Sequence, residues 1–573
     1  MRSSAKFLFF LCALAVAGSA QDIPHLVKQG TATQLIVDGK PFLALAGELD
    51  NDASTDLDNL RPLWPMLVRM NLNTVLPPAY WELVEPEEGK FDFTPIDGML
   101  QEARRHNLRL MLLWFASWKN GMSNYAPLWA KKDTQRFPRV QTRTGADLEM
   151  FSSIEGYGDA TRDADARAFA ALLRHLKAVD GQQHTVIMIQ VENEMGVLGD
   201  SRDRSPAANK AFERAVPKPL MDYLQKHKET LIPEFRQVWQ AAGFKSFGTW
   251  EAVFGKGPAT DEIFMAWNYA RYVGRVAEAG KAEYPLPMYV NAWLYGGKVN
   301  EPGKTPSGGP LPHVMDVWRA GAPAIDMLSP DAYGNFAEFC AKYDRSGNPL
   351  FIPETIGGPE GAARALYAFG QHGAIGYTPF LIESNPQWDS NNELGRVYRA
   401  IARLMPLITA RQGKDSIKGV FLEEGRTQKL SLGDYTMNAA FGAAALRTWS
   451  SPPLPPASAM PPSGALFVLT APDEFYVIAS GAMTITFTPN TPGPPIVGVG
   501  SVDEGRFVDG RWVQGRRLTN YGMRGATGSM GVPPSPGPAL VLVPEVFARN
   551  LHSLGFAGQD DGPGILRVRL YRY

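Results

Sequence analysis

Short apolar runs alternate with stretches of helical spacing over the first two thirds of the chain. Eight such runs occupy residues 41–49, 73–78, 108–116, 185–194, 287–294, 324–333, 349–355 and 374–380. Between most runs the apolar residues recur with the period of an amphipathic helix, as in residues 95–107 and 163–179. Continuous apolar runs of this length are typical of strands that are buried on both faces of a parallel sheet.

Strand–helix units repeated eight times predict an α/β fold, a (β/α)8 TIM barrel with insertions. A doubly wound open sheet would need a glycine-rich phosphate turn after the first strand, and the segment GELDNDAS at 47–54 is not such a turn. The long segment 195–286 between the fourth and fifth runs contains helical patterns. We expect it to be an insertion on the active-site face or an elaborated helix.

The pattern changes near residue 410. From residues 414–424 onward the apolar runs are short, alternate with polar residues and are interrupted by glycine and proline, which predicts an antiparallel β-domain. We therefore expect a catalytic barrel over 21–410 and a β-sandwich-like domain over 411–573. Proline-rich segments at 450–464 and 529–538 are interpreted as loops.

The first twenty residues have the three-part pattern of a secretory signal peptide. Arg2 and Lys6 precede an apolar run over 7–17, and small residues lead to Ala20. We predict cleavage after Ala20 and a secreted, periplasmic protein. A lipid anchor at Cys12 is the alternative, but Cys12 lies within the apolar run and lacks small residues before it. No later stretch is long and apolar enough to predict a membrane span.

After cleavage Cys340 would be the only cysteine, so an internal disulfide is excluded, and this favours a bacterial periplasm. The formal net charge of the 573 residues is -1, which gives no basic field for binding nucleic acid. Aromatic residues make up 11% of the chain. That content suits either a surface that stacks on sugar rings or an aromatic core.

Polar residues follow several of the predicted strands, at the end where TIM barrels carry their active sites. These residues are Trp118, Lys119 and Asn120 after the third run, Asn193 and Glu194 in the fourth, Asp331 and Tyr333 in the sixth, and Glu354 in the seventh. Two carboxyl groups from opposite sides of a barrel mouth are what glycoside hydrolysis needs, one as acid and one as nucleophile. The acid must hold its proton near neutral pH, which needs burial or a neighbouring carboxylate.

Each candidate also has a structural interpretation. A glutamate after a strand is usually a solvated loop residue, but the joint positions of Glu194 and Glu354 favour catalysis. Glu192 and His184 are interpreted as structural, and Trp114 as packed in the barrel. Tyr333 is either a core residue or a donor to the nucleophile, and both readings stay open.

The sequence shows no His, Cys and Asp cluster with metal-ligand spacing. A Ser–His–Asp triad has no G-x-S-x-G motif to support it. We therefore expect no metal and no cofactor.

Three segments resemble the β-galactosidases of glycoside hydrolase family 35, in the clan of retaining (β/α)8-barrel glycosidases. QVENEMG at 190–196 resembles the strand-four motif QVENEYG of that family. NLNTVLPPAYWELVEPEEGKFDF at 71–93 resembles its strand-two segment, and FIPETIGG at 351–358 fits its nucleophile segment. The resemblance covers roughly residues 30–400. The C-terminal part resembles weakly the small β-domain of a bacterial branch.

The resemblance implies that Glu194 is the acid/base and Glu354 the nucleophile. It also implies that Asn193 binds the sugar 2-hydroxyl and that Tyr333 hydrogen-bonds near the nucleophile. Two positions depart from the family, which indicates a divergent branch. Ser117 stands where the Ala-Glu-Trp pattern has its galactose-binding glutamate, and Pro78 replaces the strand-two tyrosine, with Tyr80 two places on. We expect Tyr80, Trp118 and Asn120 to line the sugar pocket.

These observations predict a retaining exo-β-galactosidase acting on terminal β-D-galactose of oligo- or polysaccharide side chains, xyloglucan among them. A retaining mechanism predicts catalytic carboxyl groups about 5–5.5 Å apart, whereas about 8 Å or more would indicate inversion. The alternatives are another sugar specificity (β-glucosidase, β-mannanase or arabinopyranosidase) and a non-catalytic glycan-binding protein. The C-terminal domain is interpreted as a structural support, with a carbohydrate-binding module as the alternative. The sequence does not predict the oligomeric state.

Overall fold

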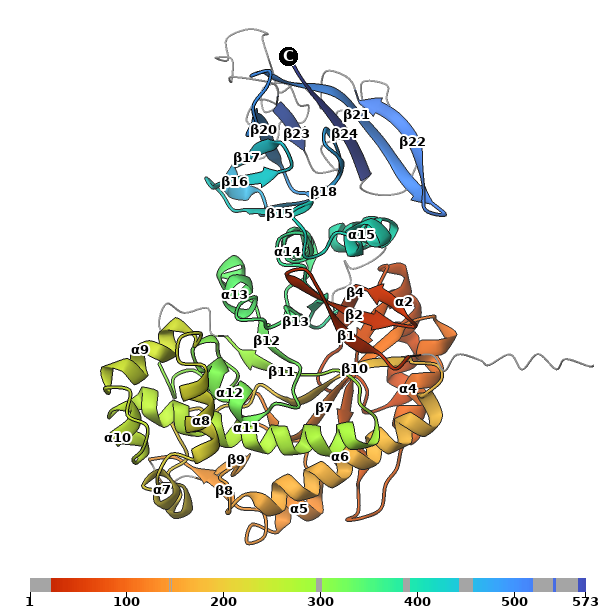
Figure 1. Ribbon diagram of the computed structural model, residues 1–573. Coiled ribbons are helices and arrows are strands. Elements are labelled where there is room, and N and C mark those ends of the chain that lie inside the picture. The colour runs from red at the N-terminus through yellow and green to blue at the C-terminus, as the bar shows by residue number, and fades with distance from the viewer. Residues whose placement is uncertain are drawn as a thin grey trace, which may run out of the picture.

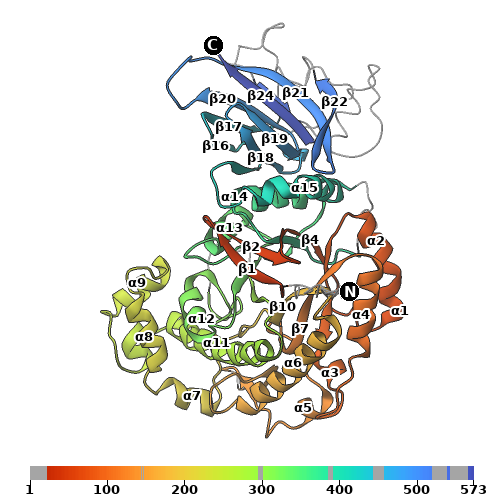
Figure 2. The same cartoon turned by 45° about the vertical axis from the view of Figure 1, so that its right-hand side comes forward.

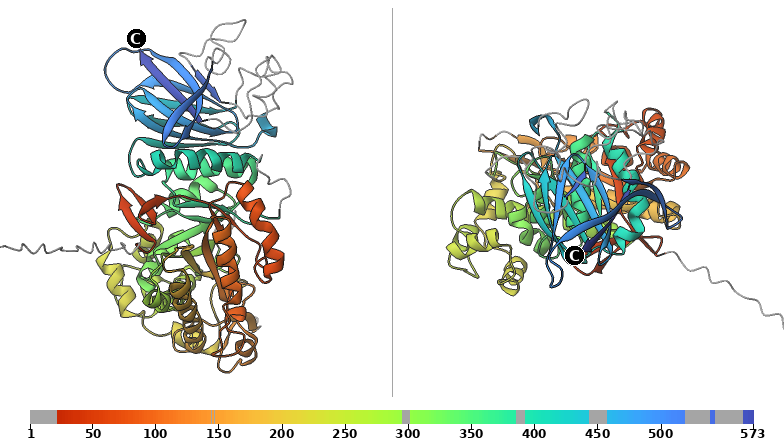
Figure 3. Two further views of the ribbon diagram at one scale, coloured as in Figure 1. Left: turned by 90° about the vertical axis from the view of Figure 1, so that its right-hand side faces the viewer. Right: turned by 90° about the horizontal axis from the view of Figure 1, so that it is seen from above.

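A computed structural model describes residues 22–143, 145, 147–294, 301–384, 392–442, 457–518, 539–542 and 565–573. The predicted signal peptide, the proline-rich loop at 529–538 and part of the loop at 450–464 lie outside these residues. The chain forms a barrel domain and a smaller β-domain. The β-domain lies above the barrel in Figure 1, and the left view of Figure 3 shows the same arrangement from the side. Among the described helices, none has the length and apolar character needed to cross a bilayer.

Eight parallel strands close into a barrel, which confirms the predicted fold class. They are β4 (Ala44–Glu48), β5 (Thr74–Leu76), β7 (Arg109–Lys119), β10 (Val186–Asn193), β11 (Met288–Trp293), β12 (Met327–Asp331), β13 (Ile352–Thr355) and β14 (Gly376–Pro379). The barrel closes because β14 pairs with β4 and β10 pairs with β7. A short strand, β6 (Pro78–Tyr80), also pairs with β7. Each of the eight apolar runs overlaps one barrel strand.

Side chains of β7 alternate between the barrel interior and the surrounding helices, as the period of a strand requires. Met111, Leu113 and Phe115 belong to the core inside the barrel. Trp114 belongs to the core between barrel and helices and contacts Phe169 at a ring-centroid distance of 5.6 Å. The interior core also includes side chains of an N-terminal antiparallel sheet, which consists of β1 (His25–Gln29), β2 (Ala32–Val37) and β3 (Lys40–Phe42).

Helices surround the barrel. They are α1 (Leu57–Leu60), η1 (Arg61–Leu63), α2 (Trp64–Arg69), α3 (Trp81–Val84), α4 (Thr94–Arg105), α5 (Leu128–Lys132), α6 (Asp159–Asp180), α11 (Pro258–Glu283), η2 (Pro312–Val314), α12 (Met315–Gly321), α13 (Phe336–Tyr343), α14 (Gly358–Gln371) and α15 (Glu393–Thr409). The segment 195–286 is an insertion followed by the barrel helix α11. The insertion carries α7 (Pro206–Phe212), α8 (Lys218–Lys226), α9 (Pro233–Ala241) and α10 (Trp250–Phe254), the yellow helices of Figure 1. A two-stranded sheet of β8 (Arg139–Gln141) and β9 (Asp147–Phe151) follows β7.

The C-terminal domain consists of two antiparallel sheets, as the alternation of its sequence predicts. One sheet has the order β15-β18-β19-β24-β21-β22 and the other β16-β17-β20-β23. The strands are β15 (Ile417–Leu422), β16 (Thr427–Leu432), β17 (Tyr435–Phe441), β18 (Ser463–Ala471), β19 (Glu474–Ser480), β20 (Met483–Pro489), β21 (Val497–Val508), β22 (Arg511–Leu518), β23 (Ala539–Leu542) and β24 (Ile565–Arg572), with the short helix η4 (Ala457–Ala459) before β18. One core cluster joins the two sheets and includes Val420, Met437, Phe467 and Ile485.

The other face of the larger sheet packs on the barrel helices α14 and α15, which lie between the two domains in Figure 2. Leu466, Val468 and Ile478 of this face belong to the main core of the barrel domain.

Three glycines allow α14 to contact the sheet backbone directly. A Cβ on Gly464 would lie 2.3 Å from the carbonyl oxygen of Ala363, and a Cβ on Gly370 would lie 2.8 Å from the Cα of Gly419. The junction between the domains is therefore a continuous packed core.

Candidate active site

Three carboxyl groups meet at the carboxyl ends of β10, β12 and β13. They belong to Glu194, Asp331 and Glu354, and one oxygen of each lies within 4.8 Å of one oxygen of each of the others. All three side chains are buried. The structure thus brings together the two glutamates that the sequence singled out, and places an aspartate between them.

The backbone at the end of β10 directs neighbouring carboxyl groups to different places. Glu192 and Glu194 both have left-handed φ values, 59° and 46°, which are uncommon for residues other than glycine. The Glu194 amide donates to Asn291 Oδ1 at 3.0 Å, and Asn291 Nδ2 donates to Asp331 Oδ2 at 2.9 Å. The amide of Asn291, on β11, therefore links the carboxyl ends of β10 and β12.

Glu354 is held by a tyrosine and by the backbone of its neighbouring strand. The hydroxyl of Tyr333 donates to Glu354 Oε1 at 2.5 Å, and the Ala332 amide donates to the Glu354 carbonyl at 2.8 Å. Burial raises the pKa of Glu354, while the charge of Lys119 and the hydrogen bond from Tyr333 act to lower it. The pKa of Glu354 stays above its ordinary value, and Lys119 and Tyr333 limit this rise by favouring the ionised form that a nucleophile needs.

Glu194 lies in an environment that favours its protonated form. Burial and the charge of Glu354 raise the pKa of Glu194 to about 7, against the opposing effects of Lys119 and of a hydrogen bond with Asp331. Burial, followed by the charges of nearby carboxylates, also raises the pKa of Glu48 and of Asp331. Because these four carboxyl groups share one buried region, they cannot all be ionised at neutral pH.

Asn193 and Lys119 form a buried pair beside the carboxyl groups. The Lys119 ammonium donates to Asn193 Oδ1 at 2.9 Å. The amide nitrogen Nδ2 of Asn193 is buried and has no hydrogen-bond partner among the described residues. Its two N–H groups are thus available to an acceptor on a ligand.

Trp118 does not line this site, so the prediction that it faces the sugar is wrong. Its side chain is 0% exposed, and its ring meets Tyr269 of α11 edge-on at a centroid distance of 4.9 Å. Like Trp114 and Ala116, it belongs to the core between barrel and helices. The next residue, Lys119, contacts the inward-facing Phe115 and Asn193 instead.

The described contacts of Tyr80 and Asn120 do not include the carboxyl groups. The Tyr80 hydroxyl donates to the Asn51 carbonyl at 2.7 Å, and its ring packs on Phe115 and Tyr125. The Asn120 amide donates to the Asn193 carbonyl at 3.1 Å. Asn120 Oδ1 is buried and unpartnered among the described residues. Tyr80 therefore supports the loop after β4, while Asn120 borders the site.

Glu192 contacts the end of β7 and a buried network outside the barrel mouth. It accepts from Ser117 Oγ at 2.9 Å and from the Trp118 amide at 2.8 Å. Ser117 Oγ also lies 2.7 Å from the hydroxyl of Tyr272, which donates to Asp165 at 3.0 Å. Ser117, where the family 35 pattern has its sugar-binding glutamate, thus faces these structural groups.

His184, at the opposite end of β10, is bonded to Asp38 through Nδ1 at 2.9 Å.

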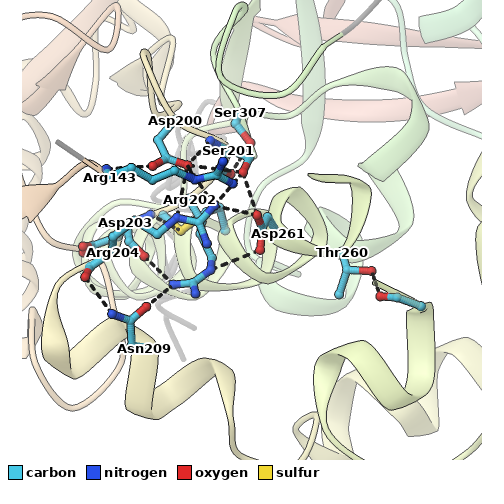
Figure 4. Close-up of polar contacts among 12 residues, drawn as sticks. Arg143, Asp200, Ser201, Arg202, Asp203, Arg204, Asn209, Thr260, Asp261 and Ser307 are labelled. Carbon is cyan, nitrogen blue, oxygen red and sulfur yellow. Dashed lines mark hydrogen bonds and ion pairs between the residues drawn. The ribbon is translucent and has the colours of Figure 1, made fainter. Parts of the chain in front are cut away.

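The segment after Glu194 is anchored to α11 by a charged network, shown in Figure 4. Arg204 contacts Asp200 and Asp261 at 2.8 Å each, and Arg202 contacts Asp261 at 3.1 Å. Ser307 Oγ donates to the Ser201 carbonyl at 2.6 Å, which joins this segment to the one after β11. The network holds in place the polypeptide that continues from Glu194.

Sequence reasoning missed Glu48, Asn291 and the inward orientation of Lys119. Glu48 ends the first barrel strand just as Glu354 ends a later apolar run, and Asn291 interrupts the fifth apolar run, so both positions carried a signal. The orientation of Lys119 depends on where β7 ends, which is beyond the apolar run.

The spacing of Glu194, Asp331 and Glu354 would also allow a cation to bridge them. However, donors from Tyr333 and Asn291 already occupy acceptor positions on two of these carboxyl groups. We interpret the cluster as carboxyl groups whose titrations are linked by their proximity.

Comparison with known proteins relates the barrel to β-galactosidases. Residues 65–260 match the Glyco_hydro_42 family model, described as a β-galactosidase, and residues 394–519 match a domain of unknown function (DUF5597). The β-galactosidase of Xanthomonas manihotis is 28% identical over 218 residues, covering 35% of this chain and 32% of that protein. The chain thus matches about a third of the length of this curated relative. These findings support the β-galactosidase resemblance but not family 35, because the matching model is of the family 42 type.

Solved structures show similar, more distant matches. The β-galactosidase from Rahnella sp. R3 is 16% identical with a TM-score of 0.41, covering 65% of this chain and 57% of that one. The catalytic domain of β-amylase from Paenibacillus polymyxa is 11% identical with a TM-score of 0.43, covering 62% of this chain and 97% of that one.

Proposed function

We propose that this protein is a retaining exo-β-galactosidase that is secreted to the periplasm. The observation that carries the proposal is the pair Glu194 and Glu354, two buried carboxyl groups close together, of which Glu194 has a pKa raised to about 7 while Glu354 accepts the hydrogen bond of Tyr333. Such a difference between two carboxyl groups is how glycosidases separate a proton donor from a nucleophile.

The reaction would proceed by double displacement. Glu354 attacks the anomeric carbon while Glu194 transfers its proton to the leaving oxygen, and a covalent glycosyl-enzyme forms. Glu194, now ionised, removes a proton from water, which attacks the same carbon and releases Glu354. Oxygens within 4.8 Å support this route, since inverting enzymes need a wider gap to admit water between the carboxyl groups.

Neighbouring residues suit their parts in this reaction. The hydroxyl of Tyr333 stabilises the ionised Glu354. Asn193 Nδ2, which has no partner among the described residues, would donate to the sugar 2-hydroxyl, a contact that strengthens in the transition state.

Galactose is the sugar we propose, because the family model over residues 65–260 and the Xanthomonas relative are both named β-galactosidase. The substrate would be a terminal β-D-galactosyl group on an oligo- or polysaccharide side chain, with xyloglucan as the first polymer to examine. The signal-like pattern of residues 1–20 supports export.

The test is turnover of p-nitrophenyl β-D-galactopyranoside by the parent, Glu194→Ala and Glu354→Ala. Parent turnover with β-galactose as the first product anomer is expected, and α-galactose as first product would overturn retention. Azide should restore Glu194→Ala by forming the β-azide and Glu354→Ala by forming the α-azide. Glu88→Ala is the control, because Glu88 is exposed and pairs with Arg136 on the surface.

A panel of aryl glucosides, mannosides and arabinopyranosides would then test the sugar. Preference for one of these over galactose would change the specificity but keep the mechanism. Binding of sugar without turnover of any of them would instead indicate a non-catalytic glycan-binding protein.

A further inference from the structure

Lys119 is a buried cation that takes no direct part in the proposed double displacement. We propose that Lys119 is a positioning residue that fixes the amide of Asn193 toward the sugar 2-hydroxyl, and that its buried ammonium supplies the positive charge of the carboxyl cluster that includes Glu354. The first half rests on the proposed glycosidase function, whereas the second half concerns the free protein.

The location of Lys119 is defined by three kinds of contact. It is the last residue of β7, pairs with Asn193 in the strand register and is only 4% exposed. Its amide donates to the Ser123 carbonyl at 2.8 Å, which fixes the backbone at the strand end. Its ammonium lies 5.0 Å from the ring centre of Phe115, inside the range of a cation–π contact.

The hydrogen bond from Lys119 decides which way the Asn193 amide points. An ammonium group can only donate, so the atom that it contacts at 2.9 Å must be the oxygen Oδ1. Nδ2 is then directed elsewhere, and it is buried without a partner among the described residues. A buried unpaired donor costs about 1–3 kcal/mol, and an acceptor on the substrate would recover that free energy. Lys119 thus preserves an unpaired donor for a ligand.

The charge of Lys119 opposes a crowded set of acidic groups around Glu354. The groups that face this region are the carboxyl groups of Glu48, Glu194, Asp331 and Glu383 and the phenols of Tyr289 and Tyr333. Burial raises the pKa of Glu48, Glu194 and Glu354, and in each case the charge of Lys119 lowers it. Glu354 also accepts the Tyr333 hydrogen bond, which lowers its pKa as Lys119 does, although burial still leaves that pKa above its ordinary value.

The first experiment compares kcat/KM for aryl β-galactoside and aryl 2-deoxy-β-galactoside in the parent, Lys119→Met, Lys119→Arg, Asn193→Ala and the double variant Lys119→Met/Asn193→Ala. Lys119→Met should reduce the preference for the 2-hydroxyl by about tenfold or more, since that contact supplies several kcal/mol. It should reduce that preference no further when Asn193 is already alanine. Lys119→Arg should restore part of the preference. An equal loss on both substrates, or an additive loss in the double variant, would overturn the positioning of Asn193.

The second experiment needs no substrate. Glutamate carrying carbon-13 in its side-chain carboxyl is incorporated, and the Glu354 signal is assigned by its loss in Glu354→Gln. Lys119→Met should raise the titration midpoint of Glu354 by about 1 unit or more. An unchanged midpoint would overturn the electrostatic half of the proposal.

Lys131→Met is the matched control, because Lys131 pairs with Glu82 in an ion pair between α5 and α3. It should leave both the substrate preference and the Glu354 titration unchanged. If Lys119→Met does not fold, Lys119→Gln is used in both experiments. A parent without turnover would refute the proposed function and the 2-hydroxyl half together, while a raised midpoint would still support the electrostatic half.

Discussion

Replacing Tyr333 by phenylalanine tests whether its hydroxyl keeps the nucleophile ionised. The change removes the 2.5 Å hydrogen bond to Glu354 Oε1 and little else, because the ring is retained. A hydrogen bond to a charged group contributes about 1.5–3 kcal/mol. One pKa unit corresponds to about 1.36 kcal/mol, so the pKa of Glu354 should rise by about 1–2 units.

The sign of the effect on activity follows directly. Glu354 acts only as a carboxylate, so kcat/KM falls as pH drops through its pKa. In Tyr333→Phe this acid limb should move to higher pH by about 1–2 units, giving losses of about 10–100-fold below the limb and convergence toward the parent above it.

The assay is the pH profile of kcat/KM with an aryl β-galactoside for the parent and Tyr333→Phe. Tyr367→Phe serves as the control, since Tyr367 lies on α14 away from the carboxyl groups. A loss that is the same at every pH, with the limb in place, would refute the reasoning. It would mean that Tyr333 acts on something other than the ionisation of Glu354.

Four further predictions follow from the described contacts. Trp118→Ala should lower the free energy of unfolding, measured in urea titrations, by about 3–5 kcal/mol, because Trp118 is a core residue. Its KM should stay at the parent value, and a raised KM with unchanged stability would contradict this prediction. The pKa of Glu194 in the folded state lies above its unfolded value, so the folded state binds more protons and the free energy of unfolding falls as pH rises from about 4.5 to about 7. Glu194→Gln should flatten this dependence of melting temperature on pH. If the dependence persists in the variant, another group causes it. Gly464→Val should lower the melting temperature by several degrees and weaken the packing of the β-domain on α14, because a Cβ at this position meets the Ala363 carbonyl. An unchanged melting temperature in calorimetry would refute the tight junction. N-terminal sequencing of exported protein should begin at Gln21, and an intact Met1 would refute cleavage.

The fold was predictable because burial on both faces leaves a signal that does not depend on distant contacts. Each barrel strand appears as an apolar run, and the strand ends locate Glu194 and Glu354 at the same edge of the barrel. The bounds of the short helices in the insertion were harder to predict from the sequence, because they depend on how these helices pack against α11 and α12.

The side-chain directions at the strand ends could not be predicted. Strand parity would place Trp118 and Lys119 on opposite faces, but it does not say which face is inside when the register shifts beside the strand. Such a shift occurs between Val191 and Asn193 on the neighbouring strand β10. The left-handed φ values at Glu192 and Glu194 then interrupt the extended backbone on which simple alternation depends. Asn291 contributes through a cross-strand contact, which exists only once the barrel has closed.

The close backbone contact at glycines between α14 and the larger sheet limits how this protein can change over evolutionary time. A domain joined by a linker can be exchanged between genes, because its neighbours need not match it. Here Gly370, Gly419 and Gly464 form two complementary surfaces, and a new side chain on either one would push the other away. The barrel and its β-domain are therefore expected to be inherited together, and their sequences to vary in step at this junction.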